Sequence, residues 1–237
     1  MSERIVVTGA NRGIGLELAR CYAARGDEVW GGCRRPDEAH ELRELTDHVV
    51  ALDLASAPSI EAFASAVSAG GAPVDVLVNN AGVDARSFGV PDDERDVLQL
   101  DGDVFLAEIG VNTLGPMLLT RALLEPMRRA ERPRIVNMSS MVGSMEVAAT
   151  TGRDVGYVAS KAALNMVTVK LGVHLRDEGV IAVALHPGVL RTALASTRAP
   201  DLEEVAPAAA EIVALIDGLT MADTGTFRRR DGSVHPW

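Results

Sequence analysis

The sequence of 237 residues is poor in cysteine and has no long apolar run. Its two cysteines, Cys21 and Cys33, are too few for a disulfide framework and lack the spacing of metal ligands, so we expect buried apolar side chains and no metal site. No apolar stretch approaches the ~20 residues that span a membrane. A strand pattern begins by Ile5 and leaves no room for a signal peptide, so we expect a soluble cytoplasmic protein.

Basic residues are also scarce relative to acidic ones. The net charge of −10 argues against a nucleic-acid partner, because phosphate contacts need a basic surface. Lys161 and Lys170 are the only lysines, so a lysine inside a motif carries more weight than usual. Hydrophobic residues make up 47% of the chain, which is enough for a sizeable core, and no linker pattern interrupts them. The sequence predicts one domain over residues 1–237.

Short β-branched runs alternate with helical patterns along the whole chain. Strands are predicted at 4–8, 28–33, 49–52, 74–78, 134–138, 180–185 and about 225–227. Helices are predicted at 14–25, 37–45, 97–109, 114–130, 157–176 and 203–218, with one more that Ser59 caps and that runs to about Ser68. The alternation implies a single-domain α/β Rossmann fold: a doubly wound parallel sheet of about seven strands with helices on both faces. Ligands of such sheets bind beyond the carboxyl ends of the strands.

A glycine-rich turn, Thr8-Gly9-Ala10-Asn11-Arg12-Gly13-Ile14-Gly15, joins the first strand to the first helix. Glycine allows a tight turn and the close approach of a pyrophosphate, which the free N–H groups of the helix N-terminus stabilise. The turn alone could be an ordinary loop, but its place between strand and helix favours a dinucleotide site. The cofactor-binding residues predicted in this turn are Gly9, Asn11, Arg12, Gly13, Ile14 and Gly15.

The segment after the second strand indicates which dinucleotide is bound. An acidic residue there favours NAD, whereas this chain has Cys33 followed by Arg34 and Arg35. Arginine suits the 2′-phosphate of NADP(H), and Arg12 could converge on the same phosphate. The alternative is that these arginines are ordinary solvated side chains. We expect NADP(H) to be favoured over NAD(H), with Arg34 as a cofactor-binding residue.

The third and fourth strands end in further candidate contacts. Asp53 is a candidate acceptor for the adenine amino group, with Leu54 against the ring, although a helix N-cap or turn aspartate is an equal alternative. The turn after the fourth strand brings the backbone close to the cofactor, so Asn80, Ala81 and Gly82 are predicted to bind it.

The sixth strand ends in a rigid turn that contains proline and glycine. We expect this turn and the hydroxyl that follows it to orient the nicotinamide amide. The predicted contacts are Pro187, Gly188, Val189 and Thr192. His186, at the end of the strand, is expected to be structural.

Tyr157 and Lys161 lie at positions i and i+4, on one face of a predicted helix. The ordinary pKa of a phenol is about 10, which is too high for efficient proton transfer at neutral pH. A fixed ammonium favours the phenolate, so we expect Lys161 to lower the pKa of Tyr157. Ser140 could hold and polarise the substrate carbonyl beside this tyrosine. Ser139 is the other candidate for this role. Alternatively, Ser140 is an ordinary turn or N-cap serine.

Six segments, TGANRGIG, NNAG, the asparagine Asn112, the Ser139-Ser140 pair, YVASK and HPGVLRT, resemble the short-chain dehydrogenase/reductase family in their order, over essentially the whole chain. The resemblance implies Tyr157 as general acid/base, with Lys161, which also binds the cofactor, on the ribose hydroxyls. It further implies that Ser140 binds the carbonyl and that Asn112 holds a water linking Lys161 to solvent. These four residues form the predicted catalytic set, and Tyr157 is also a predicted cofactor contact.

The resemblance also bears on assembly and subgroup. It implies a homodimer or homotetramer formed through the helices around 97–130 and 157–176. The tail from Ile216 to Trp237 looks like that of C-factor-like and carbonyl-reductase-like members. The segment 142–156 differs from that subgroup, and the loop after Thr192 is short and nearly without aromatic residues. Both segments are expected to line the substrate side.

Together these residues predict an NADP(H)-dependent oxidoreductase with a small-molecule substrate. It would reduce an aldehyde or ketone to an alcohol, or catalyse the reverse, while Tyr157 transfers the proton. One alternative is a dehydratase, epimerase or enoyl reductase on the same scaffold. The other is a C-factor-like NAD(P)-binding signalling or sensing protein with little turnover.

Overall fold

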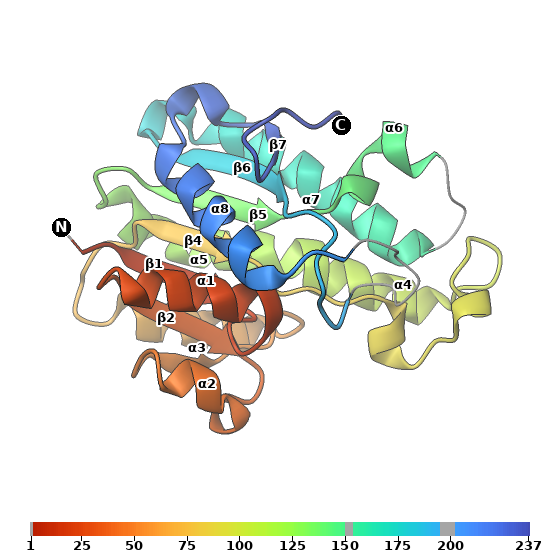
Figure 1. Cartoon of the computed structure of the whole chain (residues 1–237), viewed down its shortest axis with the longest axis horizontal. Helices are drawn as coiled ribbons and strands as arrows, with labels where there is room; N and C mark the ends of the chain where they lie inside the picture. The colour runs from red at the N-terminus through yellow and green to blue at the C-terminus, as the bar shows by residue number, and fades with distance from the viewer. Residues whose placement is uncertain (1, 150–153, 195–201) are drawn as a thin grey trace.

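The computed structural model describes residues 2–149, 154–194 and 202–237, in which seven parallel strands form one sheet in the order β3-β2-β1-β4-β5-β6-β7 (Figure 1). This confirms the predicted doubly wound α/β fold. The strands are β1 (Arg4–Thr8), β2 (Glu28–Cys33), β3 (Val49–Ala51), β4 (Val76–Asn79), β5 (Arg134–Met138), β6 (Ile181–His186) and β7 (Phe227–Arg229). The described α-helices are α1 (Gly13–Ala24), α2 (His40–Arg43), α3 (Ala57–Ser68), α4 (Gly102–Ile109), α5 (Gly115–Arg128), α6 (Met145–Ala148), α7 (Val155–His174) and α8 (Val205–Gly218).

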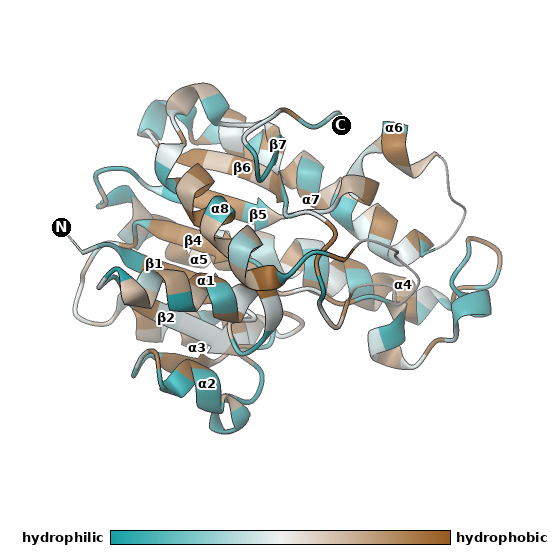
Figure 2. Cartoon of the chain, viewed as in Figure 1, coloured by the Kyte–Doolittle hydropathy of each residue, from teal (hydrophilic) through white to brown (hydrophobic). Residues whose placement is uncertain are grey.

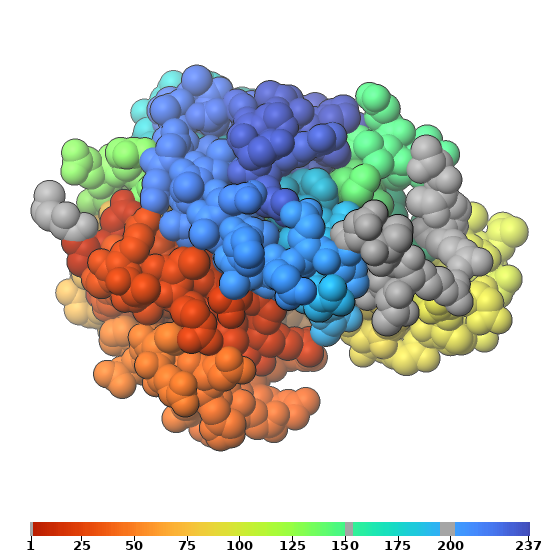
Figure 3. All heavy atoms as spheres, viewed as in Figure 1, coloured from red at the N-terminus to blue at the C-terminus, as the bar shows by residue number. Residues whose placement is uncertain are grey.

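The sheet is covered by apolar layers on both faces. Along β1, Ile5 and Val7 share one buried cluster with residues of α1 and α8, whereas Val6 belongs to a second cluster with residues of α3 and α5. Helices α1 and α8 lie side by side in Figure 1, and Figure 3 shows their atoms in contact on that face. Strands β4, β5 and β6 are coloured largely as hydrophobic in Figure 2, as parallel strands buried on both faces should be.

Helices α4 and α5 follow one another without a break in helical structure. The sequence predicts two helices around Asn112, but residues Gly110–Leu114 form a π-helical turn in which the N–H of Gly115 donates to the carbonyl of Gly110. Such a turn inserts one extra residue and is frequent at functional sites. The extra residue shifts the apolar periodicity, which is why the pattern reads as two helices. Helix α4 also begins at Gly102, because Asp101 caps it, and not at residue 97 as predicted.

The cap of α3 also differs from the prediction. Ser56 is the N-cap, and its hydroxyl accepts from the N–H of Ser59 at 3.3 Å. The Ser59 hydroxyl instead accepts from the N–H of Asp53 at 2.9 Å. Pro58 fits the first turn of the helix that Ser56 caps, so the prediction of Ser59 as the cap was wrong by one turn.

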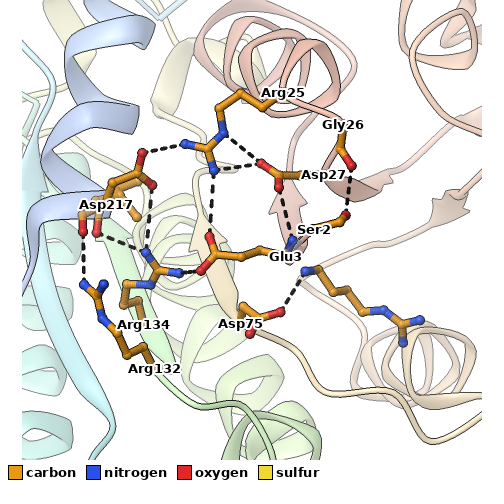
Figure 4. A network of polar contacts seen from close by, with 11 residues as sticks. Ser2, Glu3, Arg25, Gly26, Asp27, Asp75, Arg132, Arg134 and Asp217 are labelled. Carbon is orange, nitrogen blue, oxygen red and sulfur yellow. Dashed lines mark hydrogen bonds and ion pairs between the residues drawn. The ribbon is translucent and has the colours of Figure 1, made fainter.

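Charged side chains pair with one another at the amino edge of the sheet (Figure 4). We call them the amino-edge network: Glu3, Arg25, Asp27, Arg134 and Asp217. Arg134 is almost fully buried and pairs with Glu3 and, at 3.9 Å, with Asp217. Arg25 pairs with Asp217 at 2.5 Å and with Asp27 at 2.7 Å. The network therefore joins the chain before β1, the end of α1, the start of β5 and the end of α8.

The last residues of the chain lie against the segment that follows β5 (Figure 1). The carbonyl of Trp237 accepts from the N–H of Met145 and from the hydroxyl of buried Ser144, both at 3.1 Å. This contact ties the tail to α6. Within the described ranges, no helix is both long and apolar enough to cross a membrane.

Candidate active site

The glycine turn and the segment after β4 are bonded together at the carboxyl edge of the sheet. The hydroxyl of Thr8 accepts from the backbone N–H groups of Asn80 (2.9 Å) and Ala81 (3.0 Å), and the Asn80 amide donates to the Thr8 carbonyl (2.9 Å). The N–H of Gly9 donates to the Gly32 carbonyl at 2.8 Å, which fixes the turn to β2 as well. Two predicted cofactor segments thus form one unit. Thr8, which holds them together, was not among the predicted site residues.

The glycines of the turn are required by space and by backbone geometry. A Cβ atom on Gly15 would lie 2.4 Å from the Gly9 carbonyl oxygen, and one on Gly9 would lie 3.0 Å from the Ala81 Cα. Gly9 and Gly13 have φ values of +65° and +55°, which side chains disfavour. Because α1 begins at Gly13, the N–H groups of its first turn face this glycine turn, where no side chain at Gly9, Gly13 or Gly15 would block a ligand. The turn therefore fits a dinucleotide pyrophosphate. Asn11 is exposed beside it, and Ile14 is half-buried.

Two arginines at this edge have guanidinium groups available for a ligand. The side chains of Arg12 and Arg34 are exposed, and neither makes an ion pair or hydrogen bond with another described residue. Arg35 differs, because it donates twice to Glu38, at 2.8 and 3.0 Å. The turn and the end of β2 are bonded to each other, so both free arginines lie at the same edge of the sheet.

Asp53 and Leu54 follow β3. One Asp53 carboxylate oxygen accepts from the N–H of Ala55 at 3.0 Å, as in a turn aspartate, and the residue is exposed. Leu54 is 6% exposed and belongs to the core, where a Cβ atom on Gly115 would lie 2.7 Å from its Cβ. Only a small edge of Leu54 is therefore accessible to an adenine ring.

Ser140 and Tyr157 are brought together at the end of β5. The Tyr157 side chain is hydrogen-bonded to that of Ser140. The hydroxyl of Ser139 is buried and has no partner among the described residues, and its backbone N–H donates to Leu185 in β6 at 2.8 Å. The geometry thus favours Ser140 over its rival Ser139 as the serine that faces the phenol.

The buried Lys161 lies beside Tyr157. Its Nζ donates to the Met138 carbonyl at 2.8 Å and lies 5.6 Å from the centre of the Tyr157 ring. Burial lowers the pKa of Lys161 to about 8. Burial also raises the pKa of Tyr157 to about 12, against the hydrogen bond of Ser140, which lowers it. The pKa of Tyr157 is therefore raised and not lowered as expected, because desolvation of the phenolate is the largest cause of its shift.

Asn112 is fully buried in the π-helical turn and joins three elements. Its side-chain oxygen accepts from the N–H of Val83 at 2.8 Å, and its amide donates to the Val83 carbonyl (2.8 Å) and the Ser160 hydroxyl (2.9 Å). Both amide hydrogens are thus used within the protein. A Cβ atom on the neighbouring Gly82 would lie 3.4 Å from the Asn112 oxygen and 3.6 Å from the Lys161 Nζ. Asn112 and Lys161 therefore line the same space beside Gly82.

The segment after β6 lies beside the glycine turn. Thr192 lies near Gly13, since a Cβ atom on that glycine would lie 3.7 Å from a Thr192 methyl carbon. Gly188 has a φ of +99°, and Arg230 donates to the Pro187 carbonyl at 3.0 Å. Val189 is exposed. Burial lowers the pKa of His186 to about 4, which agrees with a structural histidine.

Three charged residues near Tyr157 were not predicted. Asp84 and Arg86 form an ion pair in the turn after Val83, and Glu108 lies on α4. Asp84 and Glu108 raise the pKa of Tyr157, and Arg86 lowers it. Arg86 also donates to the Leu194 carbonyl at 2.5 Å, so it reaches the segment after Thr192. Parts of the expected substrate side, residues 150–153 and 195–201, lie outside the described residues.

Comparison with known proteins identifies the family of the chain. The family model described as short chain dehydrogenase matches residues 3–203. An uncharacterized oxidoreductase of Schizosaccharomyces pombe is 31% identical, over 98% of this chain and 96% of its own length. The C-signal protein of Myxococcus xanthus is 36% identical, over 75% of this chain and all of its own length.

Solved structures are similar over the whole chain. The NADPH-bound carbonyl reductase from chicken fatty liver superposes with a TM-score of 0.89 at 28% identity, covering 100% of this chain and 99% of its own. A short-chain dehydrogenase/reductase from Burkholderia multivorans with bound NADP has a TM-score of 0.82 at 26% identity and covers 100% of both chains.

The fold and the site define an oxidoreductase built on a dinucleotide-binding sheet. With the family model matching most of its length, the chain belongs to the short-chain dehydrogenase family. Within that family it is similar to the C-signal protein and the carbonyl reductases, as its tail predicts.

Proposed function

We propose that the protein is an NADP(H)-dependent carbonyl reductase that converts an aldehyde or ketone to an alcohol, or catalyses the reverse. The observation that carries the proposal is the hydrogen-bonded pair of Ser140 and Tyr157 beside buried Lys161. The bare glycine turn and the NADPH-bound and NADP-bound relatives support the cofactor. Loss of NADPH absorbance with a panel of aldehydes and ketones tests the proposal, and no turnover of any of them contradicts it.

The side chains at the site fit this chemistry. NADPH, when bound, would supply a hydride to the carbonyl carbon. Ser140 donates a hydrogen bond to the carbonyl oxygen and polarises it, and Tyr157 gives its proton to that oxygen as the C–H bond forms. Lys161 binds the ribose hydroxyls, and its positive charge lowers the cost of the phenolate that Tyr157 becomes. Asn112 holds the water through which Lys161 receives a replacement proton.

The cofactor preference follows from Arg12 and Arg34. Replacing Arg34 by alanine removes a charge-assisted contact to the 2′-phosphate, so the Kd for NADPH should rise about 10- to 100-fold. The Kd for NADH should stay unchanged, because NADH lacks that phosphate. Fluorescence titration of both cofactors measures the two effects.

Arg35→Ala is the matched control for Arg34→Ala, since Arg35 is adjacent but already bonded to Glu38. It should leave both affinities near those of the wild type. Tighter binding of NADH than of NADPH by the wild type contradicts the preference.

A second candidate function follows from the similarity to the C-signal protein. A signalling or sensing protein would bind NADP(H) but turn over few carbonyls. A dehydratase, epimerase or enoyl reductase would use the same scaffold with other substrates. Strong cofactor binding without reduction of any carbonyl would favour these alternatives over a reductase.

We propose a homodimer or homotetramer formed through α4, α5 and α7. These helices expose apolar side chains: Leu106 is 65%, Met166 57% and Val173 72% exposed. Replacing Met166 by glutamate should shift the protein to the monomer, because burying an unpaired charge in an interface costs several kcal/mol. Sedimentation velocity measures this shift, and a monomeric wild type contradicts the proposal.

A further inference from the structure

Glu108 is a buried acid that the proposed reaction does not use. Its side chain has no exposed surface, and neither carboxylate oxygen has a partner of good hydrogen-bond geometry within the described part of the chain, where the Ala85 backbone N–H is the donor that faces it. A buried polar group without a partner costs free energy, and a buried charge costs more. Glu108 is also the one residue of α4 that is buried. An unsatisfied group of this kind calls for an explanation.

The Glu108 carboxyl lies against the first turn of α7. A Cβ atom on Gly156 would lie 1.9 Å from Oε2 of Glu108, so this oxygen fills the space above Gly156. Gly156 immediately precedes Tyr157. Glu108 also lies four residues before Asn112, on the same helix face, and Asn112 reaches Ser160 of α7. The two side chains together fix α7 on either side of the tyrosine.

Among the described residues, charged groups from two neighbouring segments face Glu108. Asp84, paired with Arg86, comes from the turn after β4, and Asp154, paired with Arg95 at 3.2 Å, comes from the start of α7. Burial, followed by the charges of Asp84 and Asp154, raises the pKa of Glu108 to about 7. The Ala85 backbone N–H and Arg95 lower this pKa without reversing the shift. Glu108 in turn raises the pKa of Tyr157.

We propose that Glu108 is a positioning residue for Tyr157: its carboxyl fixes the first turn of α7 through Gly156, and on losing its proton it adds a negative charge that keeps the phenol protonated. This inference rests on the proposed function. A protonated phenol is the form that carbonyl reduction needs, whereas alcohol oxidation needs the phenolate. Ionised Glu108 therefore favours reduction over oxidation as the pH rises.

The two tyrosines of the chain allow a direct test without turnover. In protein labelled with ¹³C at the tyrosine Cζ, Tyr157→Phe assigns the two resonances. We expect the Tyr157 resonance of the wild type to shift with a step near pH 7 as Glu108 ionises. In Glu108→Gln this step should be absent, and only the step near pH 8 that comes from Lys161, 5.6 Å from the ring, should remain. A wild type without the step, or a variant that keeps it, overturns the proposal.

The pH dependence of alcohol oxidation is the second readout. In Glu108→Gln the rising limb of kcat/KM should move to lower pH by about half a unit, because the charge that opposes the phenolate is gone. A limb that stays in place or moves to higher pH overturns the proposal. A merely structural role for Glu108 would lower the rate without moving the limb.

Two further variants keep the test decisive. Glu125→Gln makes the same change on the exposed side of α5, where Glu125 pairs only loosely with Arg128 and Arg129, and it should retain both the step and the limb. Glu108→Leu fills the same space and carries no ionisable group. If the glutamine variant disturbs α7, the leucine variant should still lack the step near pH 7 and show the shifted limb. A wild type that reduces no carbonyl removes the proposed function, while the resonance step still tests Glu108 by itself.

Discussion

Replacing Tyr157 by phenylalanine is expected to lower kcat for carbonyl reduction about 10²- to 10⁴-fold, the contribution typical of a positioned general acid. The phenyl ring keeps the shape of the site, but no group remains to give a proton to the carbonyl oxygen. Because the ring does not carry the pyrophosphate contacts, the Kd for NADPH should change little. Stopped-flow or steady-state loss of NADPH absorbance, together with fluorescence titration, separates these two effects.

The second tyrosine provides the control for Tyr157→Phe. Tyr22 is a residue of α1 that is buried in the core, and its hydroxyl has no hydrogen-bond partner among the described residues. Tyr22→Phe removes an unsatisfied hydroxyl far from the carboxyl edge of the sheet, so it should keep wild-type turnover. Near-native turnover in Tyr157→Phe would contradict the assigned mechanism.

Replacing Glu3 by glutamine is expected to lower the free energy of unfolding by about 3 kcal/mol, because it leaves a buried guanidinium without its main partner. Arg134 is 2% exposed, its Nε has no partner among the described residues, and its other carboxylate, Asp217, is 3.9 Å away. Urea unfolding of variant and wild type measures the loss.

The double variant Glu3→Gln/Arg134→Met tests the physical reason for this loss. Replacing both partners of a buried pair by uncharged residues is often close to neutral, so the double variant should recover most of the stability lost in Glu3→Gln. Glu204→Gln, in an exposed pair with Arg191, should leave the urea midpoint unchanged. A double variant no more stable than Glu3→Gln would show that the charge of Arg134 is not what is costly.

The strands and the glycine turn could be predicted from the sequence, because their causes are local. The β-branched run at Arg4–Thr8 needs no distant residue to form a strand, and Gly13 has a positive φ that few other residues adopt. Ser140 follows the end of β5 and Tyr157 lies in the first turn of α7, the long helix between β5 and β6, so both could be expected at the carboxyl edge of the sheet.

The electrostatics of the site could not be predicted in the same way. The sign of the Tyr157 shift depends on how much of the ring is buried and on charges from Asp84 and Glu108, which come from other segments. The spacing of Tyr157 and Lys161 places them on one face but does not say that the ammonium bonds to the Met138 carbonyl. Glu108 could have been noticed as an acid four residues before Asn112, although its contact with Gly156 needs the packing of α4 on α7.

The burial of Lys161 has a practical consequence for labelling. Of the two lysines, Lys161 is buried and Lys170 is exposed on α7. An amine-reactive dye therefore has one accessible lysine side chain. Met166, Lys170 and Val173 are spaced four and three residues apart, so they share one face of the helix. A fluorophore on Lys170 sits among the apolar residues proposed to join two copies, and its anisotropy reports directly on their association.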